Sequence, residues 1–126
     1  MDGPHEWDFS PLDTELREAL AVSSTATLAT VLFGRGLRNR VVSGIHALVP
    51  GHRMVGVIRT LRYLPNREDL DTMPNWQRND NPQRYIAETI EPGQVLMIDA
   101  RQSEASGTMG GMLAIRMKMR GAAGIV

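Results

Sequence analysis

The sequence contains no cysteine, and this absence excludes several classes of protein at once. Disulfide-rich scaffolds, thiolate enzymes and zinc–thiolate sites all require cysteine side chains. An excess of either charge is also missing, because the 14 basic and 14 acidic residues give a formal net charge of zero. A general nucleic-acid binder usually carries an excess of positive charge, so we expect no direct contact with nucleic acid.

Long hydrophobic runs are absent as well. No stretch approaches the ~20 apolar residues that a membrane-spanning helix needs. The N-terminus lacks the basic and apolar regions of a signal peptide. With 126 residues, of which 42% are hydrophobic, the chain is long enough for one domain with a real core. We expect a single cytoplasmic domain over residues 1–126, with no membrane contact and with residues 1–9 forming a loose arm.

Several catalytic motifs are missing too. The chain has no Gly-x-Ser-x-Gly elbow for a nucleophilic serine, and no GxGxxG or GxxxxGK[ST] loop for a nucleotide. His5, His46 and His52 lack the spacing of metal ligands. The carboxylates of residues 67–71 follow one another in a polar loop, where we expect them to face solvent and not to hold a metal.

The sequence does contain an alternation of helix and strand patterns, which predicts an α/β fold. Two N-terminal helices are expected. The first starts with Ser10 as its cap and Pro11 in its first turn and ends near Val22, and the second ends at Gly34 or Gly36. The other expected elements are strands over residues 41–48, 54–64 and 94–99, a loop over 65–82 and a helix over 82–90. Because the strand over 54–64 has apolar residues on both faces, we expect it to be central.

Two groups of arginines have open interpretations. Arg35, Arg38 and Arg40 could contact a phosphate or a carboxylate, or could interact with the negative end of the preceding helix. We prefer the second interpretation, because no aromatic residue is interleaved with them. Arg59 and Arg62 should point to opposite faces of their strand, so at most one can face a given site. Either could instead be an ion-pair partner within an oligomer interface.

The most informative stretch follows the strand over residues 94–99. Asp99 ends that strand, a small polar loop follows, and Gly110-Gly111 opens a helical segment that ends at Gly121. A last apolar run then occupies residues 122–126. Strand, glycine loop, helix and strand is the order of a βαβ unit, in which a helix N-terminus can hold an anion beside the sheet.

The glycine pair has two interpretations. The backbone N–H groups of Gly111, Met112 and Leu113 would point out of the helix start, where they suit a carboxylate or an enolate oxygen. A tight turn that needs glycine for packing alone explains the same residues equally well. The motif by itself does not decide between them.

Taken in order, several motifs resemble the RraA-like family, also known as the metal-dependent 4-hydroxy-4-methyl-2-oxoglutarate aldolase family. The resemblance runs from about Leu16 to Val126. The matching motifs are Ser24-Thr-Ala-Thr-Leu28, Gly36-Leu-Arg-Asn39, Thr60-Leu-Arg-Tyr63 with Arg67-Glu-Asp-Leu70, Pro92-Gly93 through Val95 to Asp99, and Gly110-Gly-Met-Leu113 followed by Arg120-Gly-Ala-Ala-Gly-Ile-Val126.

The resemblance implies a layered β/β/α fold of the swivelling-domain type, assembling as homotrimers or hexamers. It also implies a lyase, of the aldolase or oxaloacetate decarboxylase type, that uses Mg or Mn to cleave a small 2-oxo acid through a pyruvate enolate. Gly110, Gly111, Met112 and Leu113 match the loop whose amides contact the substrate. Namesake members instead bind and inhibit an RNA-degrading endonuclease, which is the alternative function. A sugar-acid dehydratase or a related reaction is a third hypothesis.

Two departures from the family pattern stand out. Aldolase members often carry an acidic residue at the position of Gly111. After the strand that matches Ala122–Val126, they continue with Asp-Gly-x-x-Arg-Asp, whose arginine holds the substrate and whose last aspartate anchors the metal. We therefore expect a domain that is incomplete at its C-terminus, metal-binding residues beyond Val126, and little aldolase activity from these 126 residues alone.

Overall fold

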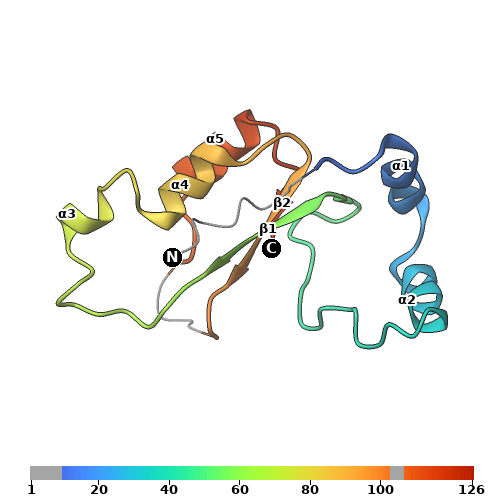
Figure 1. Ribbon diagram of the computed structural model, residues 1–126. Helices are drawn as coiled ribbons and strands as arrows, with labels where there is room; N and C mark the ends of the chain where they lie inside the picture. Colours follow the sequence, from blue (N-terminus) through green and yellow to red (C-terminus); the bar gives the residue numbers. More distant parts are fainter. Residues whose placement is uncertain (1–9, 103–106) are drawn as a thin grey trace, which may run out of the picture. The chain divides into compact units, whose positions relative to one another are not determined.

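The structure, a computed structural model, describes residues 10–102 and 107–126 (Figure 1). The chain divides into two compact units, one ending at Val57 and the other running from Ile58 to Val126. The expected loose arm, residues 1–9, lies outside the described residues, as do residues 103–106 of the glycine loop.

The first unit begins with helix α1, Thr14–Val22. Asp13 caps this helix, because its carboxylate accepts a hydrogen bond from the Leu16 N–H at 3.2 Å. The prediction that Ser10 is the cap is therefore wrong, since the Asp13 carboxylate already satisfies a free donor of the first turn. The predicted end near Val22 is confirmed.

Helix α2, Thr25–Gly34, follows after a short break. Ser24 caps it by accepting a hydrogen bond from the Thr27 N–H at 3.0 Å. Within the described ranges, no single helix is long and apolar enough to cross a membrane. Among the described helices, α1 and α2 pass such a test when they are counted together, and they are bent by 116° at the break.

Residues 35–56 contain no helix or strand, so the predicted strand over residues 41–48 is wrong. Gly44 in its middle has φ +79°, a left-handed conformation that interrupts an extended chain. None of residues 10–57 is buried. The side chains of this unit include large apolar ones with high exposure, such as Val22 at 83% and Leu48 at 98%.

The second unit is built on a sheet with the order β1-β2-β3, formed by Val57–Arg62, Gln94–Asp99 and Gly124–Ile125. Strands β2 and β3 are parallel, with Val95 opposite Gly124. The Tyr63 N–H donates to the Asp99 carbonyl at 3.0 Å, which places the carboxyl ends of β1 and β2 side by side. The predicted α/β character is confirmed.

Strand β2 is the central strand, so the prediction that the strand over residues 54–64 is central is wrong. Along β1, half-buried residues alternate with exposed ones. Its apolar residues therefore do not mean that both faces are covered: Leu61 packs against the core, while Ile58 on the other face is 49% exposed.

Three helices complete this unit: α3 (Met73–Trp76), α4 (Pro82–Thr89) and α5 (Gly111–Met119). Helix α3 is a single turn within the predicted loop over residues 65–82. The predictions of α4, of strand β2 and of the helix opened by Gly110-Gly111 are confirmed. Figure 1 shows α4 and α5 side by side, and the two helices are in contact.

The core lies where these two helices pack against the sheet. Ile90 at the end of α4, Leu96 of β2 and Met117 of α5 are fully buried, each with an exposure of 0%. Leu61 and Ile98 of the sheet pack against the same cluster. Because side chains alternate along a strand, α4 and α5 therefore cover the same face of the sheet.

A tight turn connects α5 to β3. Gly121 has φ +87°, and a Cβ added there would lie 3.1 Å from Cβ of Pro92. Its carbonyl accepts a hydrogen bond from the Gly93 N–H at 2.9 Å. Glycine is required at this position both by the left-handed backbone and by the close approach of Pro92.

Candidate functional site

The N-terminus of α5 is the predicted anion site. Gly110 is its N-cap, with φ −81° and ψ 150°, and its carbonyl accepts the Ala114 N–H at 3.1 Å. No side chain of the described residues caps the helix, so the N–H groups of Gly111, Met112 and Leu113 have no side-chain acceptor there. Gly110, Gly111 and Met112 are exposed. These amides face outward at the positive end of a helix.

Packing among the described residues does not explain the glycine pair. Neither Gly110 nor Gly111 has a positive φ. A Cβ added at either position would meet nothing within 4 Å. The backbone and its neighbours would therefore accept alanine at both positions, unlike at Gly121. What the glycines do provide is a helix start without side chains, where a ligand can approach the main chain closely.

A network of hydrogen bonds holds the segment that enters α5. The Tyr63 hydroxyl donates to the Thr108 carbonyl at 2.5 Å. Nε2 of Gln83 donates both to the Tyr63 hydroxyl and to the Thr108 carbonyl, at 2.8 Å each. Partial burial raises the pKa of Tyr63, and the hydrogen bond from Gln83 lowers it by less, so the phenol keeps its proton near neutral pH.

An ion pair lies at the carboxyl ends of β1 and β2, on the face of the sheet opposite the core. Nε of Arg62 lies 2.8 Å from Oδ2 of Asp99, and the other carboxylate oxygen of Asp99 accepts the Arg101 N–H at 3.0 Å. These hydrogen bonds, first that of Arg101 and then that of Arg62, hold the pKa of Asp99 below its usual range. Along β1, Arg62 points away from the face that bears Leu61 and Tyr63. Asp99 therefore ends its strand as predicted, but in a pair with Arg62.

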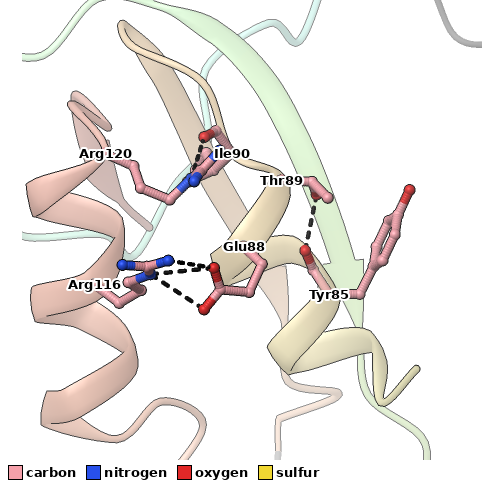
Figure 2. A network of polar contacts seen from close by, with 6 residues as sticks. All are labelled: Tyr85, Glu88, Thr89, Ile90, Arg116 and Arg120. Atoms are coloured by element: carbon pink, nitrogen blue, oxygen red, sulfur yellow. Dashed lines mark hydrogen bonds and ion pairs between the residues drawn. The ribbon is translucent and has the colours of Figure 1, made fainter. Parts of the chain in front are cut away.

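Helices α4 and α5 are linked by polar contacts, which Figure 2 shows. Nη2 of Arg116 lies 2.6 Å from Oε2 of Glu88, and Nε of Arg116 contacts both carboxylate oxygens. The guanidinium holds the pKa of Glu88 below its ordinary value. Nε of Arg120 donates to the Ile90 carbonyl at 3.0 Å, at the end of α4. These contacts fix α5 against α4 far along the helix from its N-terminus.

The described residues contain no complete set of side-chain metal ligands. No group of three or more His, Asp or Glu side chains that could hold an ion occurs in residues 10–102 and 107–126. In the acidic loop, Arg67 forms an ion pair with Asp69, and its N–H donates to Asp71 at 2.6 Å. The hydrogen bond from Arg67 lowers the pKa of Asp69, as expected for a paired surface carboxylate.

The arginine cluster of the first unit has local contacts. The guanidinium of Arg38 lies over the Phe33 ring, 5.2 Å from its centroid. Arg35 directly follows α2, at the negative end of the helix. The preferred interpretation thus accounts for the position of Arg35, whereas Arg38 contacts an aromatic ring, which the sequence interpretation did not expect. A phosphate contact stays a prediction.

Tyr63 and Gln83 were missed as site residues by the sequence interpretation. Tyr63 directly follows an edge strand, and Gln83 lies in the first turn of α4. The signal in the sequence is weak: a polar aromatic residue at a strand end and an amide at a helix start. Only the fold brings both side chains to the Thr108 carbonyl.

Comparisons with known proteins add independent evidence. The family model described as RraA-like: Aldolase/RraA matches residues 25–126. Among solved structures, the chain is similar to Streptomyces coelicolor RraAS2, described as an unusual member of the RNase ES inhibitor RraA protein family. The two share 35% sequence identity with a TM-score of 0.73, over 90% of this chain and 52% of that one. The chain thus spans about half the length of this solved relative. A search of the curated proteins found no match.

Proposed function

This chain belongs to the RraA-like family, Aldolase/RraA, and on that premise we propose that it takes part in a lyase reaction on a small 2-oxo acid. The reaction is the cleavage of a carbon–carbon bond, with pyruvate released through its enolate. One observation carries the proposal. The amides of Gly111, Met112 and Leu113 open α5 with no side-chain cap among the described residues.

The geometry suits an oxygen anion. A helix N-terminus carries about +0.5 of an elementary charge, and its free N–H groups point along the axis toward a ligand. Donors that are already oriented stabilise charge as it develops on an enolate oxygen, because they need little reorganisation during the reaction. Gly110 and Gly111 leave the approach to these donors open. We assign Gly110, Gly111, Met112 and Leu113 to substrate binding.

The proposed setting extends beyond the described residues. Family membership supports a layered β/β/α swivelling-domain architecture in a single domain, a homotrimer or hexamer, and a cytoplasmic location. It also supports dependence on Mg or Mn. Because residues 10–102 and 107–126 contain no group of three or more His, Asp or Glu side chains that could hold such an ion, we assign no step to it.

A coupled assay for pyruvate release tests the proposal. The substrates are oxaloacetate and a 4-hydroxy-2-oxo acid, each with Mg or Mn, and a protein-free sample with the same ion serves as the blank. We expect activity from the full product of the gene and little from the 126 residues alone. The absence of metal-dependent pyruvate from the full product would overturn the proposal.

A matched pair of variants tests the role of the amides. Proline is well tolerated at the first position of a helix but has no N–H, so Gly111→Pro removes one donor and keeps α5. Gly111→Ala keeps the donor and meets open space. We expect Gly111→Pro to lower kcat by about 10²-fold, the usual effect of losing one oxyanion donor. Equal activities in the two variants would contradict the assignment.

A second function is favoured by the solved relative, whose title places it in the RNase ES inhibitor RraA protein family. Under this alternative, the chain binds and regulates an RNA-degrading endonuclease through protein contacts. Gly111, which lacks the acidic side chain often found in aldolase members, is compatible with it. The test measures RNA cleavage by purified RNase ES with and without the protein. Inhibition by both wild type and Gly111→Pro, without pyruvate release, would favour this alternative over the lyase.

A further inference from the structure

The segment that leads into α5 is held at one point from two elements. The Thr108 carbonyl accepts hydrogen bonds from the Tyr63 hydroxyl at 2.5 Å and from Nε2 of Gln83 at 2.8 Å. A carbonyl oxygen has two lone pairs, so these two donors use its full capacity. Two bonds to one oxygen fix the orientation of the peptide unit as well as its position.

The two donors also hold each other. Gln83 donates its second N–H to the Tyr63 hydroxyl at 2.8 Å, so the three groups form a closed triangle. Tyr63 stands at the end of β1, and Gln83 stands in the first turn of α4, where Asn81 accepts the Gln83 backbone N–H at 3.0 Å. The triangle thus ties the entry to α5 to a strand and to a second helix.

The next residue adds an apolar anchor. Met109 packs against the core cluster, and Gly110 follows it as the N-cap of α5. The chain therefore reaches the glycines with both a carbonyl and a side chain held. The Gly110 carbonyl accepts the Ala114 N–H within α5, and among the described residues a Cβ at Gly110 or Gly111 would meet nothing within 4 Å. Thr108 and Met109 are therefore the held positions directly before the first amides of α5, while Arg116 and Arg120 hold the other end of the helix.

We propose that Tyr63 and Gln83 are positioning residues, which aim the free amides of α5 by holding the Thr108 carbonyl. They do not themselves need to touch the substrate. The inference rests on the proposed function for what the amides bind, but the direction of the amides is measurable without any ligand. A residue that served only stability would change the unfolding transition and leave the amide directions in the folded state unchanged.

The first experiment is solution NMR of the ligand-free full chain. Residual dipolar couplings report the directions of the Gly111, Met112 and Leu113 N–H bonds. The carbonyl ¹³C shift of Thr108 reports its hydrogen bonds. We expect Tyr63→Phe and Gln83→Leu each to move both readouts. Tyr85→Phe, which removes the same hydroxyl from an exposed tyrosine, should move neither. Unchanged couplings in both test variants would overturn the proposal.

The second experiment titrates the same proteins with oxalate, a stable mimic of the pyruvate enolate. We expect Tyr63→Phe to weaken oxalate binding about fivefold, as for the loss of a hydrogen bond worth about 1 kcal/mol. Gly111→Pro serves as the reference for losing a donor outright. Altered couplings with unchanged oxalate affinity would also overturn the positioning role. If wild type does not bind oxalate, the substrate assignment fails, while the couplings still decide the positioning.

Thermal unfolding shows whether each variant is folded, so that loss of the fold is not mistaken for a change in the amide directions. Tyr63→Phe keeps the ring and its packing, so it should fold even if Gln83→Leu does not. In that event Gln83→Met, which keeps an unbranched chain without a donor, takes its place. Couplings are interpreted only for variants with a cooperative transition. If neither Gln83 variant folds, the Tyr63→Phe couplings decide the proposal.

Discussion

The two units of the chain contain similar apolar side chains and use them differently. In the second unit, Ile90, Leu96 and Met117 are fully buried between two helices and a sheet. In the first unit no described residue is buried, and Leu48 is 98% exposed. Secondary structure follows the same division: residues 10–56 contain helices α1 and α2 and no strand, and the sheet belongs to the second unit.

The difference shows which elements can form from local signals. Helices α1 and α2 start at Asp13 and Ser24, whose side chains accept N–H groups three residues later. Such a cap needs nothing from the rest of the chain. A strand needs a neighbour for its N–H and C=O groups, so residues 41–48 cannot become one by pattern alone.

The largest expected effect comes from the core of the second unit. Leu96→Ala removes a fully buried side chain, so the free energy of unfolding should fall by about 2–5 kcal/mol. Leu48→Ala, the same change at a side chain that is 98% exposed, should shift it by less than ~0.5 kcal/mol. Urea unfolding of both variants measures the difference. Equal effects would show that the first unit has a core of its own.

The next prediction compares two glycines with left-handed backbones. Gly36 has φ +80° and open space around it, whereas Gly121 has φ +87° and Pro92 at 3.1 Å. Both Gly36→Ala and Gly121→Ala should cost about 1 kcal/mol or more through backbone strain, and Gly121→Ala should cost additional free energy through the clash. Amide exchange followed residue by residue measures the effect in each unit separately. A larger loss at Gly36 would reverse the comparison.

A third prediction concerns the helix caps. Ser24→Ala removes the acceptor for the Thr27 N–H, and such a loss costs about 1 kcal/mol. Because α2 has no buried residue, we expect the loss to appear as fraying of that helix in its NMR carbon shifts. Asn81→Ala removes the corresponding cap of α4, whose Ile86 and Ala87 are buried. Packing should keep α4 formed, so equal fraying in the two helices would contradict the contrast.

The smallest expected effect is the pH dependence of the pair between α4 and α5. Arg116 lowers the pKa of Glu88 in the folded state, so the pair stabilises the fold above the ordinary pKa of a glutamate. That contribution should be lost as pH falls through the lowered pKa. Glu88→Gln should therefore unfold more easily than wild type near pH 7, and the difference should vanish in acid. A difference that persists in acid would show that Glu88 stabilises by packing.

In the second unit, the sequence predicted which helices and strands form more reliably than it predicted the order of the strands. Strand β2 and helix α5 carry clear apolar and glycine signals, and both were predicted. The order of the strands was not, because an edge strand such as β1 can carry apolar residues on its exposed face, as Ile58 shows. Burial of a face depends on what packs there, which is not encoded in the strand itself.

The candidate site was predicted in part for the same reason. The amides of Gly111 to Leu113 follow from a local rule, since every helix start has free N–H groups. The triangle at Thr108 joins residues separated by 20 to 45 positions, and no periodicity relates them. Arg62 and Asp99, which are 37 positions apart, are likewise paired only by the register of two strands. Contacts of this range depend on topology.

Helix α4 has eight residues, fewer than the ~12–15 that an isolated helix needs to persist in water. The C-terminal end of α4 accepts hydrogen bonds from one residue before the helix in the chain and from one residue after it. Arg59 donates to the Thr89 carbonyl and Arg120 to the Ile90 carbonyl, and each donor is 30 positions from its acceptor. The entropy lost on closing a loop depends on its length, so the two closures oppose folding equally. Between these two contacts, chain entropy therefore favours neither β1 nor α5 as the first element to join α4 during folding.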